Sequence, residues 1–267
     1  MKRTKTMMTR EEARRYAITY LLEERGETNI ELPAEEAAQC TLLRALINER
    51  RPLLVTAKFR SAQEIELQAQ RAERGDVEWR ETLPTVDPRL RIWQGDITRL
   101  KVDAIVNAAN AQLLGCFIPL HRCIDNAIHS AAGVELRLAC ADLISEQRHP
   151  EPTGRAKITP GFNLPARYVL HTVGPIIRTQ PPSGLEREQL ASCYRSCLEL
   201  AAEHKLEQVA FCCISTGEFH FPNALAAEIA VNTVREYLAH NPFSSVQQII
   251  FNVFKDEDLR IYKGLLL

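Results

Sequence analysis

The sequence predicts an α/β protein with a sheet between two layers of helices, preceded by an α-helical N-terminal extension. After Pro84, short β-forming runs alternate with amphipathic helical segments, which is typical of this fold class. Several of these runs are apolar on both faces, as expected of strands that helices cover on two sides. Before Pro84 the chain is charged, poor in glycine and poor in strand-like runs. We therefore expect a helical extension over residues 1–84 and an α/β unit over residues 85–267.

Composition excludes several classes of protein. The 267 residues are 45% hydrophobic and 25% charged, as in an ordinary globular protein, and the net charge of −1 argues against direct nucleic-acid binding. No apolar run approaches the roughly 20 residues needed to cross a membrane, and the charged N-terminus does not resemble a secretory signal. We therefore expect a cytoplasmic protein. Its eight cysteines are then core residues, metal ligands or free thiols rather than disulfides.

Three helices are expected in the extension. Thr9 has Glu12 three residues later, which is the pattern of a capping box. The helices are predicted from Thr9, from near Pro33 to Arg50, and from about Ser61 to Glu73. The charges of the first helix are expected to form a solvated face, made by Arg10, Glu11, Glu12, Arg14 and Arg15.

The α/β unit is expected to contain six strands and five helices. The strands are Leu90–Gln94, Asp103–Ala108, Ala156–Pro160, Tyr168–Val173, Val209–Ile214 and Ile249–Phe254. The helices lie near Ile124–Ala131, Val134–Ser145, Leu185–His204, Asn223–Asn241 and Asp256–Gly264, and Arg178–Gly184 is the expected surface loop. Open α/β sheets bind ligands at the carboxyl ends of their strands, so the segments that follow strands are the candidates for chemistry.

Two such segments carry polar side chains. Gly95–Thr98 follows the first strand, and by itself it is typical of a turn in which Asp96 caps what comes next. Asn107 and Asn110 end the second strand, and their amides are suited to sugar hydroxyls.

Cys116-x4-His121-x-Cys123 follows them, and its two thiols and one imidazole are able to hold a zinc ion. Three protein ligands leave a fourth position for water or substrate, which is the pattern of a catalytic site. Spacing alone leaves this interpretation evenly balanced with another, in which the cysteines are buried apolar residues and His121 lies on the surface.

Asp125 comes directly after this loop and opens a helix. A carboxylate there is a normal cap, but beside a metal it is also placed to orient or deprotonate a water molecule. His129 lies one turn further along the same face, and we expect it to be a packed helix residue.

The segment Ser215–Pro222 follows another strand. Its backbone N–H groups are suited to a diphosphate, with Phe219 and Phe221 as walls for a sugar or base, although the stretch taken alone slightly favours a plain loop between a strand and a helix. The remaining cysteines are expected in the core: Cys40, Cys140, Cys193, Cys197, Cys212 and Cys213.

Taken together, these segments resemble the macrodomain family of ADP-ribose-binding α/β/α modules. The family marks stand in order as GDIT at Gly95–Thr98, VDAIVNAAN at Val102–Asn110, D-x-x-IH-x-AAG at Asp125–Gly133, HTVGP at His171–Pro175 and ISTG-x-F-x-FP at Ile214–Pro222. Most members carry a glycine run before the catalytic Asp, of which only Gly115 remains here. The Cys–His–Cys loop and the helical extension resemble a zinc-dependent microbial subgroup.

The resemblance implies a three-layer macrodomain with a mixed central sheet over residues 85–267. It implies one Zn²⁺ per chain on Cys116, His121 and Cys123, and catalytic roles for Asp125 and Asn110. Asp96 would read the adenine amino group, Ile97 would donate a backbone contact, and Asn110 would hold the distal ribose. The full implied ADP-ribose contact set is Asp96, Ile97, Asn110, Cys123, Ile124, Asp125, Ser215, Thr216, Gly217, Glu218 and Phe219.

The implied activity is hydrolysis of mono-ADP-ribose from modified protein side chains, with acidic side chains as the expected attachment. The zinc would either fix the distal ribose or lower the pKa of the attacking water, and the sequence does not choose between these roles. The implied partners are ADP-ribose and mono-ADP-ribosylated protein, without a membrane. The alternative is a reader that binds ADP-ribose without cleaving it and uses zinc only to shape the loop.

Overall fold

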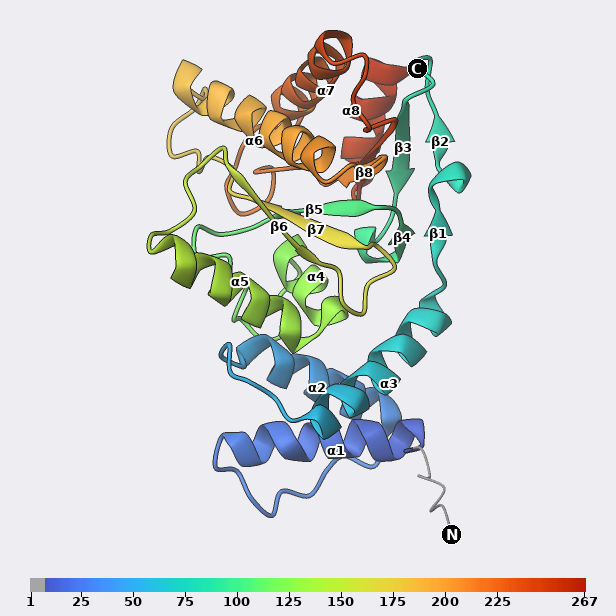
Figure 1. Cartoon of the computed structure of the whole chain (residues 1–267), viewed down its shortest axis with the longest axis vertical. Helices are drawn as coiled ribbons and strands as arrows, with labels where there is room; N and C mark the ends of the chain where they lie inside the picture. Colours follow the sequence, from blue (N-terminus) through green and yellow to red (C-terminus); the bar gives the residue numbers. More distant parts are fainter. Residues whose placement is uncertain (1–7) are drawn as a thin grey trace.

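The computed structural model describes residues 8–267 and confirms the predicted three-layer α/β fold with a mixed central sheet (Figure 1). Seven strands form this sheet in the order β2-β3-β9-β8-β5-β7-β6. Its five central strands are parallel, whereas β2 and β6 run antiparallel at the two edges. The strands are β2 (Leu83–Pro84), β3 (Leu90–Gln94), β5 (Ala104–Ala108), β6 (Ala156–Pro160), β7 (Tyr168–Thr172), β8 (Gln208–Phe211) and β9 (Gln248–Val253).

Helices cover both faces of the sheet, which explains why its strands are apolar on both sides. One layer holds α4 (Ile124–Ala132) and α5 (Val134–Gln147), and the other holds α6 (Gly184–Glu203), α7 (Asn223–His240) and α8 (Asp256–Leu266) (Figure 1). Within the described residues, no helix has the length and apolar character that a membrane span requires.

The structure adds short strands that the sequence did not predict. β1 (Val77–Glu78) pairs with β4 (Leu100–Lys101) outside the main sheet, and Leu83 of β2 pairs with Ile92 of β3. Each of these three strands has two residues, too few for an alternating pattern to be visible. β8 ends at Phe211 rather than at Ile214, since the following residues already turn into the loop.

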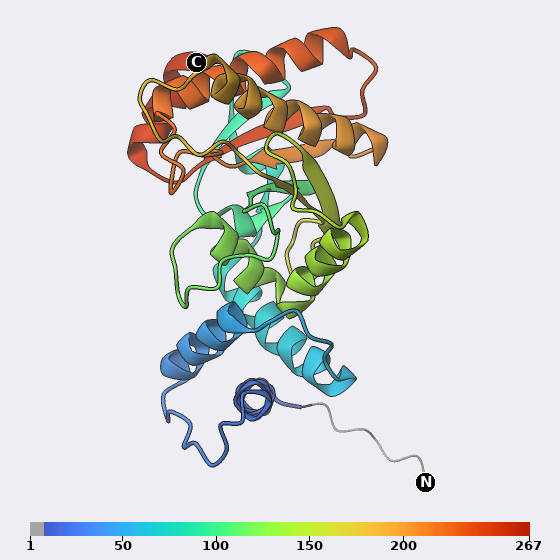
Figure 2. The ribbon, with the colours of Figure 1, turned by 90° about the vertical axis from the view of Figure 1, so that its left-hand side faces the viewer.

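The N-terminal helices α1 (Arg10–Glu24), α2 (Glu36–Glu49) and α3 (Ala57–Arg74) pack beneath the α4–α5 layer (Figure 2). The predicted capping box is confirmed, because Thr9 Oγ1 accepts from the Glu12 N–H at 3.2 Å and Glu12 Oε2 accepts from the Thr9 N–H at 2.8 Å. The third helix begins four residues earlier than predicted, since Thr56 caps it. These helices share a small core of their own, centred on Ile18, Leu43 and Phe59, which Val134 of α5 joins.

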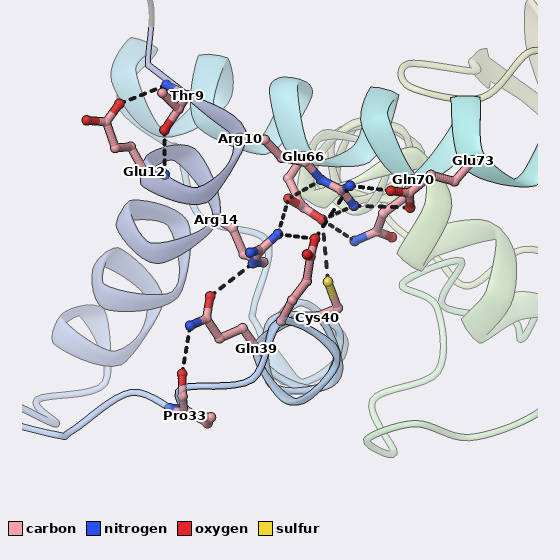
Figure 3. Close-up of polar contacts among 11 residues, drawn as sticks. Thr9, Arg10, Glu12, Arg14, Pro33, Gln39, Cys40, Glu66, Gln70 and Glu73 are labelled. Atoms are coloured by element: carbon pink, nitrogen blue, oxygen red, sulfur yellow. Dashed lines mark hydrogen bonds and ion pairs between the residues drawn. The ribbon is translucent and has the colours of Figure 1, made fainter.

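The expected solvated face of α1 is wrong in part. Glu66 of α3 is fully buried, and it accepts hydrogen bonds from Arg10 Nε at 3.1 Å and from Arg14 Nη1 at 3.2 Å (Figure 3). Gln70 Nε2 donates to the same carboxylate at 2.9 Å. Arg14 is only 4% exposed. A buried carboxylate requires such paired donors, so these charges hold the three helices together rather than facing water.

Candidate active and metal site

The Cys–His–Cys loop, residues 115–123, brings its three candidate ligands together. The ligand atoms of Cys116, His121 and Cys123 all lie within 4.8 Å of one another, and all three residues are half-buried. His121 Nδ1 is buried without a hydrogen-bond partner, while Nε2 lies 3.8 Å from Glu218 Oε1. Two thiols facing one unpartnered ring nitrogen fit a tetrahedral zinc ion, with a carboxylate placed behind the imidazole. The alternative with buried apolar cysteines and a surface His121 does not describe this geometry.

Cys123 also begins helix α4. Its Sγ accepts from the Asn126 N–H at 3.4 Å, so Cys123 is the N-cap and Asp125 lies inside the first turn. Burial raises the pKa of the Cys123 thiol to about 12. A divalent cation binds the deprotonated thiolate and would therefore reverse this effect.

Asp125 is contacted by three residues: Asn107 of strand β5, Asn110 just beyond that strand, and His129 of helix α4. Asn107 Nδ2 donates to Asp125 Oδ1 at 2.8 Å, Asn110 Nδ2 lies 3.5 Å from Oδ2, and His129 Nε2 lies 3.5 Å from Oδ1. Burial raises the pKa of Asp125 to about 6. Asn110 donates in addition to the Gly115 carbonyl at 3.0 Å, so this one side chain contacts both Asp125 and the start of the loop.

A buried polar group lies directly behind Asp125. His129, Cys140 and His171 place their nitrogen and sulfur atoms within 4.8 Å of one another, and each is at most 2% exposed. Parallel pairing of β5 with β7 sets Asn107 beside His171, with Nδ2 and Nδ1 3.2 Å apart. Burial lowers the pKa of His171 to about 3 and lowers that of His129 as well, so both rings are neutral.

Only part of this buried group was predicted from the sequence. The packed roles of His129 and Cys140 are confirmed, but Asn107 was expected to face sugar hydroxyls and is instead fully buried against Asp125. The only signal for His171 was its place in the HTVGP segment, since nothing local indicated that the sheet would bring it next to Asn107.

Asp96 caps the short 3₁₀ helix η2 (Ile97–Arg99), as the turn interpretation predicted. Its Oδ1 accepts from the Thr98 N–H at 3.0 Å. Oδ2 lies 3.3 Å from Arg74 Nη1 of α3, and 38% of the Asp96 side chain is exposed. Ile97 itself is buried. Asp96 is therefore partly exposed, and its Oδ2 accepts a hydrogen bond from an arginine of the N-terminal helices.

The loop after β8 is tightly built at its start and open at its tip. Ser215 has a left-handed backbone (φ 64°), and a Cβ on Gly174 would lie 2.0 Å from Ser215 Oγ, so only glycine fits there. Gly217 and Glu218 are exposed, whereas Thr216 and Phe219 are half-buried. Phe221 is 1% exposed in the core and does not form a ligand wall, which corrects the sequence expectation.

Four of the other six cysteines are buried as expected: Cys140, Cys193, Cys197 and Cys212. Cys40 and Cys213 are only half-buried, and Cys40 Sγ lies 3.5 Å from Glu66 Oε1 in the contact between the N-terminal helices.

Comparison with known proteins places the chain in a family. Residues 106–230 match the Macro domain family. A Protein-ADP-ribose hydrolase of Treponema medium is 48% identical over 263 residues, covering 97% of this chain and all of the relative. A Trypanosoma brucei macrodomain in complex with ADP-ribose superposes with a TM-score of 0.64 at 30% identity, covering 83% of this chain and 94% of that one. An Oceanobacillus iheyensis macrodomain mutant with ADPR gives 0.59 at 41% identity, covering 66% and 90%. The chain belongs to the Macro domain family.

Proposed function

We propose that this chain is a zinc-dependent hydrolase that removes mono-ADP-ribose from modified protein side chains. The observation that carries the proposal is the convergence of Cys116, His121 and Cys123 two residues before a buried, oriented Asp125. The name of the Treponema medium relative supports the activity, and the ligands of the two solved macrodomains support ADP-ribose as the bound nucleotide.

The residues around the proposed ribose site divide the chemistry between them. Cys116, His121 and Cys123 would hold the zinc, which supplies a Lewis acid at an open coordination position when bound. Asn107 and Asn110 fix the Asp125 carboxylate, which orients a water molecule and accepts its proton. The water oxygen forms the new bond to C1 of the distal ribose. The bond from C1 to the protein carboxylate breaks, and that carboxylate leaves with the electron pair.

The nucleotide end of the site would be read by two further segments. Asp96, whose side chain is 38% exposed and whose Oδ2 accepts from Arg74 Nη1 at 3.3 Å, would read the adenine amino group, and Ile97 would offer a backbone contact beside it. The open tip of the loop after β8, with Ser215, Thr216, Gly217, Glu218 and Phe219, would enclose the diphosphate and ribose through its N–H groups. Acidic side chains are the proposed attachment points, because a carboxylate leaves C1 without needing a proton.

The test is release of ADP-ribose from a mono-ADP-ribosylated protein, measured by chromatography with and without a chelator. We expect release by the purified protein, loss of release after chelation and recovery on adding Zn²⁺. Binding of ADP-ribose without release would instead indicate a reader, and chelator-resistant release would remove zinc from the proposal.

A further inference from the structure

Helix α2, one of the three N-terminal helices, contacts the Cys–His–Cys loop through its last two turns. Asn48, in its last turn, is fully buried. Its Oδ1 accepts from the Leu120 N–H at 3.0 Å, and its Nδ2 donates to Ser130 Oγ of α4 at 2.8 Å. One side chain of α2 therefore joins the loop backbone to the helix that carries Asp125.

Arg44 lies one turn earlier on the same face of α2. Its Nη2 lies 3.3 Å from the His121 carbonyl and 3.0 Å from Asn126 Oδ1, donating to both. Asn126 in turn donates from Nδ2 to the Ile118 carbonyl at 3.0 Å. The backbone on both sides of the His121 ring is thus held by side chains, and the outermost of these come from α2.

Other contacts hold the first part of the loop, since Asn110 donates to the Gly115 carbonyl at 3.0 Å and the Arg137 guanidinium lies 4.3 Å from the centroid of the Phe117 ring. Within residues 118–121, Leu120 adopts a left-handed backbone (φ 57°), which is sterically unfavourable for an L-residue. The apolar side chains of this segment do not anchor it by burial, because Ile118 is 59% exposed and Leu120 is 40% exposed. The conformation of residues 118–121 therefore depends largely on hydrogen bonds that side chains outside the loop make to the loop backbone.

These contacts from α2 are discrete rather than part of a continuous packed interface. A cleft of about 650 Å³ separates part of α2 and α3 from α4, with Arg44, Ala127 and Ser130 among its lining residues. The hydrogen bonds from α2 side chains to α4 and the loop come from Arg44 and Asn48. On the other side of this contact, Arg137 of α5 donates to the carbonyls of Ile47 and Arg50. Removing either side chain should change the loop while leaving the small core of the N-terminal helices in place.

We propose that Asn48 and Arg44 are positioning residues that hold residues 118–121 in the conformation in which Cys116, His121 and Cys123 converge. The inference rests on the proposed zinc site and extends it to the N-terminal helices. Pre-ordered ligands bind a metal more tightly than a mobile loop does, because less chain entropy is lost on binding.

The test compares metal binding in Asn48→Leu, Arg44→Met and the double variant with that of the natural chain. Zinc affinity is measured by competition with a chromogenic chelator, and we expect each single change to weaken it by about tenfold, as supporting residues of metal sites do. Co²⁺ in place of zinc gives a visible spectrum that reports thiolate ligation, and we expect this spectrum to change in the double variant. Amide exchange of the peptide covering residues 117–122 should become faster in all three variants.

Arg60→Ala is the matched control. Arg60 of α3 pairs with Glu135 of α5 at 3.1 Å, so this change removes a contact between the N-terminal helices and α5 without touching the loop. It should leave zinc affinity, the Co²⁺ spectrum and loop exchange unchanged. A folded double variant with natural zinc affinity and spectrum would overturn the inference, as would an equal loss in Arg60→Ala. If the natural chain takes up no zinc, the proposed function fails, and loop exchange alone decides whether α2 positions the loop.

Discussion

Two groups of cysteine and histidine flank Asp125 in the sequence, and the fold treats them in opposite ways. Cys116, His121 and Cys123 are half-buried on a loop with exposed apolar side chains. His129, Cys140 and His171 have the same chemical types and lie equally close together in space, within 4.8 Å, but they are fully buried between α4, α5 and the sheet.

The difference teaches that ligand type and proximity do not by themselves define a metal site. In the buried group, His171 already has Thr159 Oγ1 at 2.9 Å from Nε2 and Asn107 Nδ2 at 3.2 Å from Nδ1. Both ring nitrogens of His129 lack a hydrogen-bond partner, but they are enclosed away from solvent, and burial keeps both rings neutral. We therefore interpret the buried group as residues that hold Asp125 in place. The Cys–His–Cys loop is the site at which we propose that a cation binds next to the substrate. The four predictions that follow separate activity effects from stability effects.

The largest effect is expected at Asp125, which lies between the two groups. Asp125→Asn keeps the size and the hydrogen bond from Asn107 but removes the proton acceptor. ADP-ribose release should fall by about 10²–10⁴-fold, the range for a general base, while calorimetry should show ADP-ribose still binding. Near-normal turnover would assign the proton transfer to another group.

Cysteine substitutions test the comparison directly. Cys123→Ser should lower both zinc content and turnover, with turnover reduced by about a hundredfold or more. Cys140→Ala changes a thiol of the buried group, and it should retain one zinc per chain by elemental analysis and most of the activity. If Cys140→Ala loses the metal and Cys123→Ser keeps it, the two groups have been assigned the wrong way round.

Acid should weaken the fold through the buried group. The pKa of His171 is about 3 in the folded chain against an ordinary value of 6.5, so between these values the unfolded chain binds one more proton. Stability should therefore decrease as the pH falls through this window, by up to about 1.4 kcal/mol per pH unit from this residue. Asp125, whose folded pKa is raised to about 6, opposes this trend over the upper part of the window.

Urea unfolding at several pH values, compared between the natural chain and His171→Gln, isolates the histidine. The slope of stability against pH should be flatter in the variant. Parallel curves would show that His171 does not titrate as its burial predicts.

The smallest effect is expected at Thr159, which is 3% exposed and whose hydroxyl contacts His171 of the buried group. Thr159→Val keeps the shape but removes the hydroxyl, leaving His171 Nε2 with the weak Cys140 thiol contact at 3.6 Å. Loss of one such hydrogen bond should lower the free energy of unfolding by about 1 kcal/mol. Zinc content should not change, and a drop in zinc content would link the two groups after all.

Much of this protein is already determined by local sequence. The six predicted strands of the main sheet and all eight α-helices are in place, with shifted ends, because periodicity, caps and glycine act over a few residues. The Cys–His–Cys group was a candidate from the sequence because its three side chains lie within eight residues, but spacing alone left two interpretations, and the folded loop is what brings the three together.

The tertiary structure decided the rest. Asn107 and His171 meet because β5 pairs with β7, and Asn48 meets Leu120 across 72 residues of chain. Arg14 is buried against Glu66, 52 residues away, rather than solvated. Contacts at such separations depend on which faces pack and in which register, and no local pattern of residues carries that information.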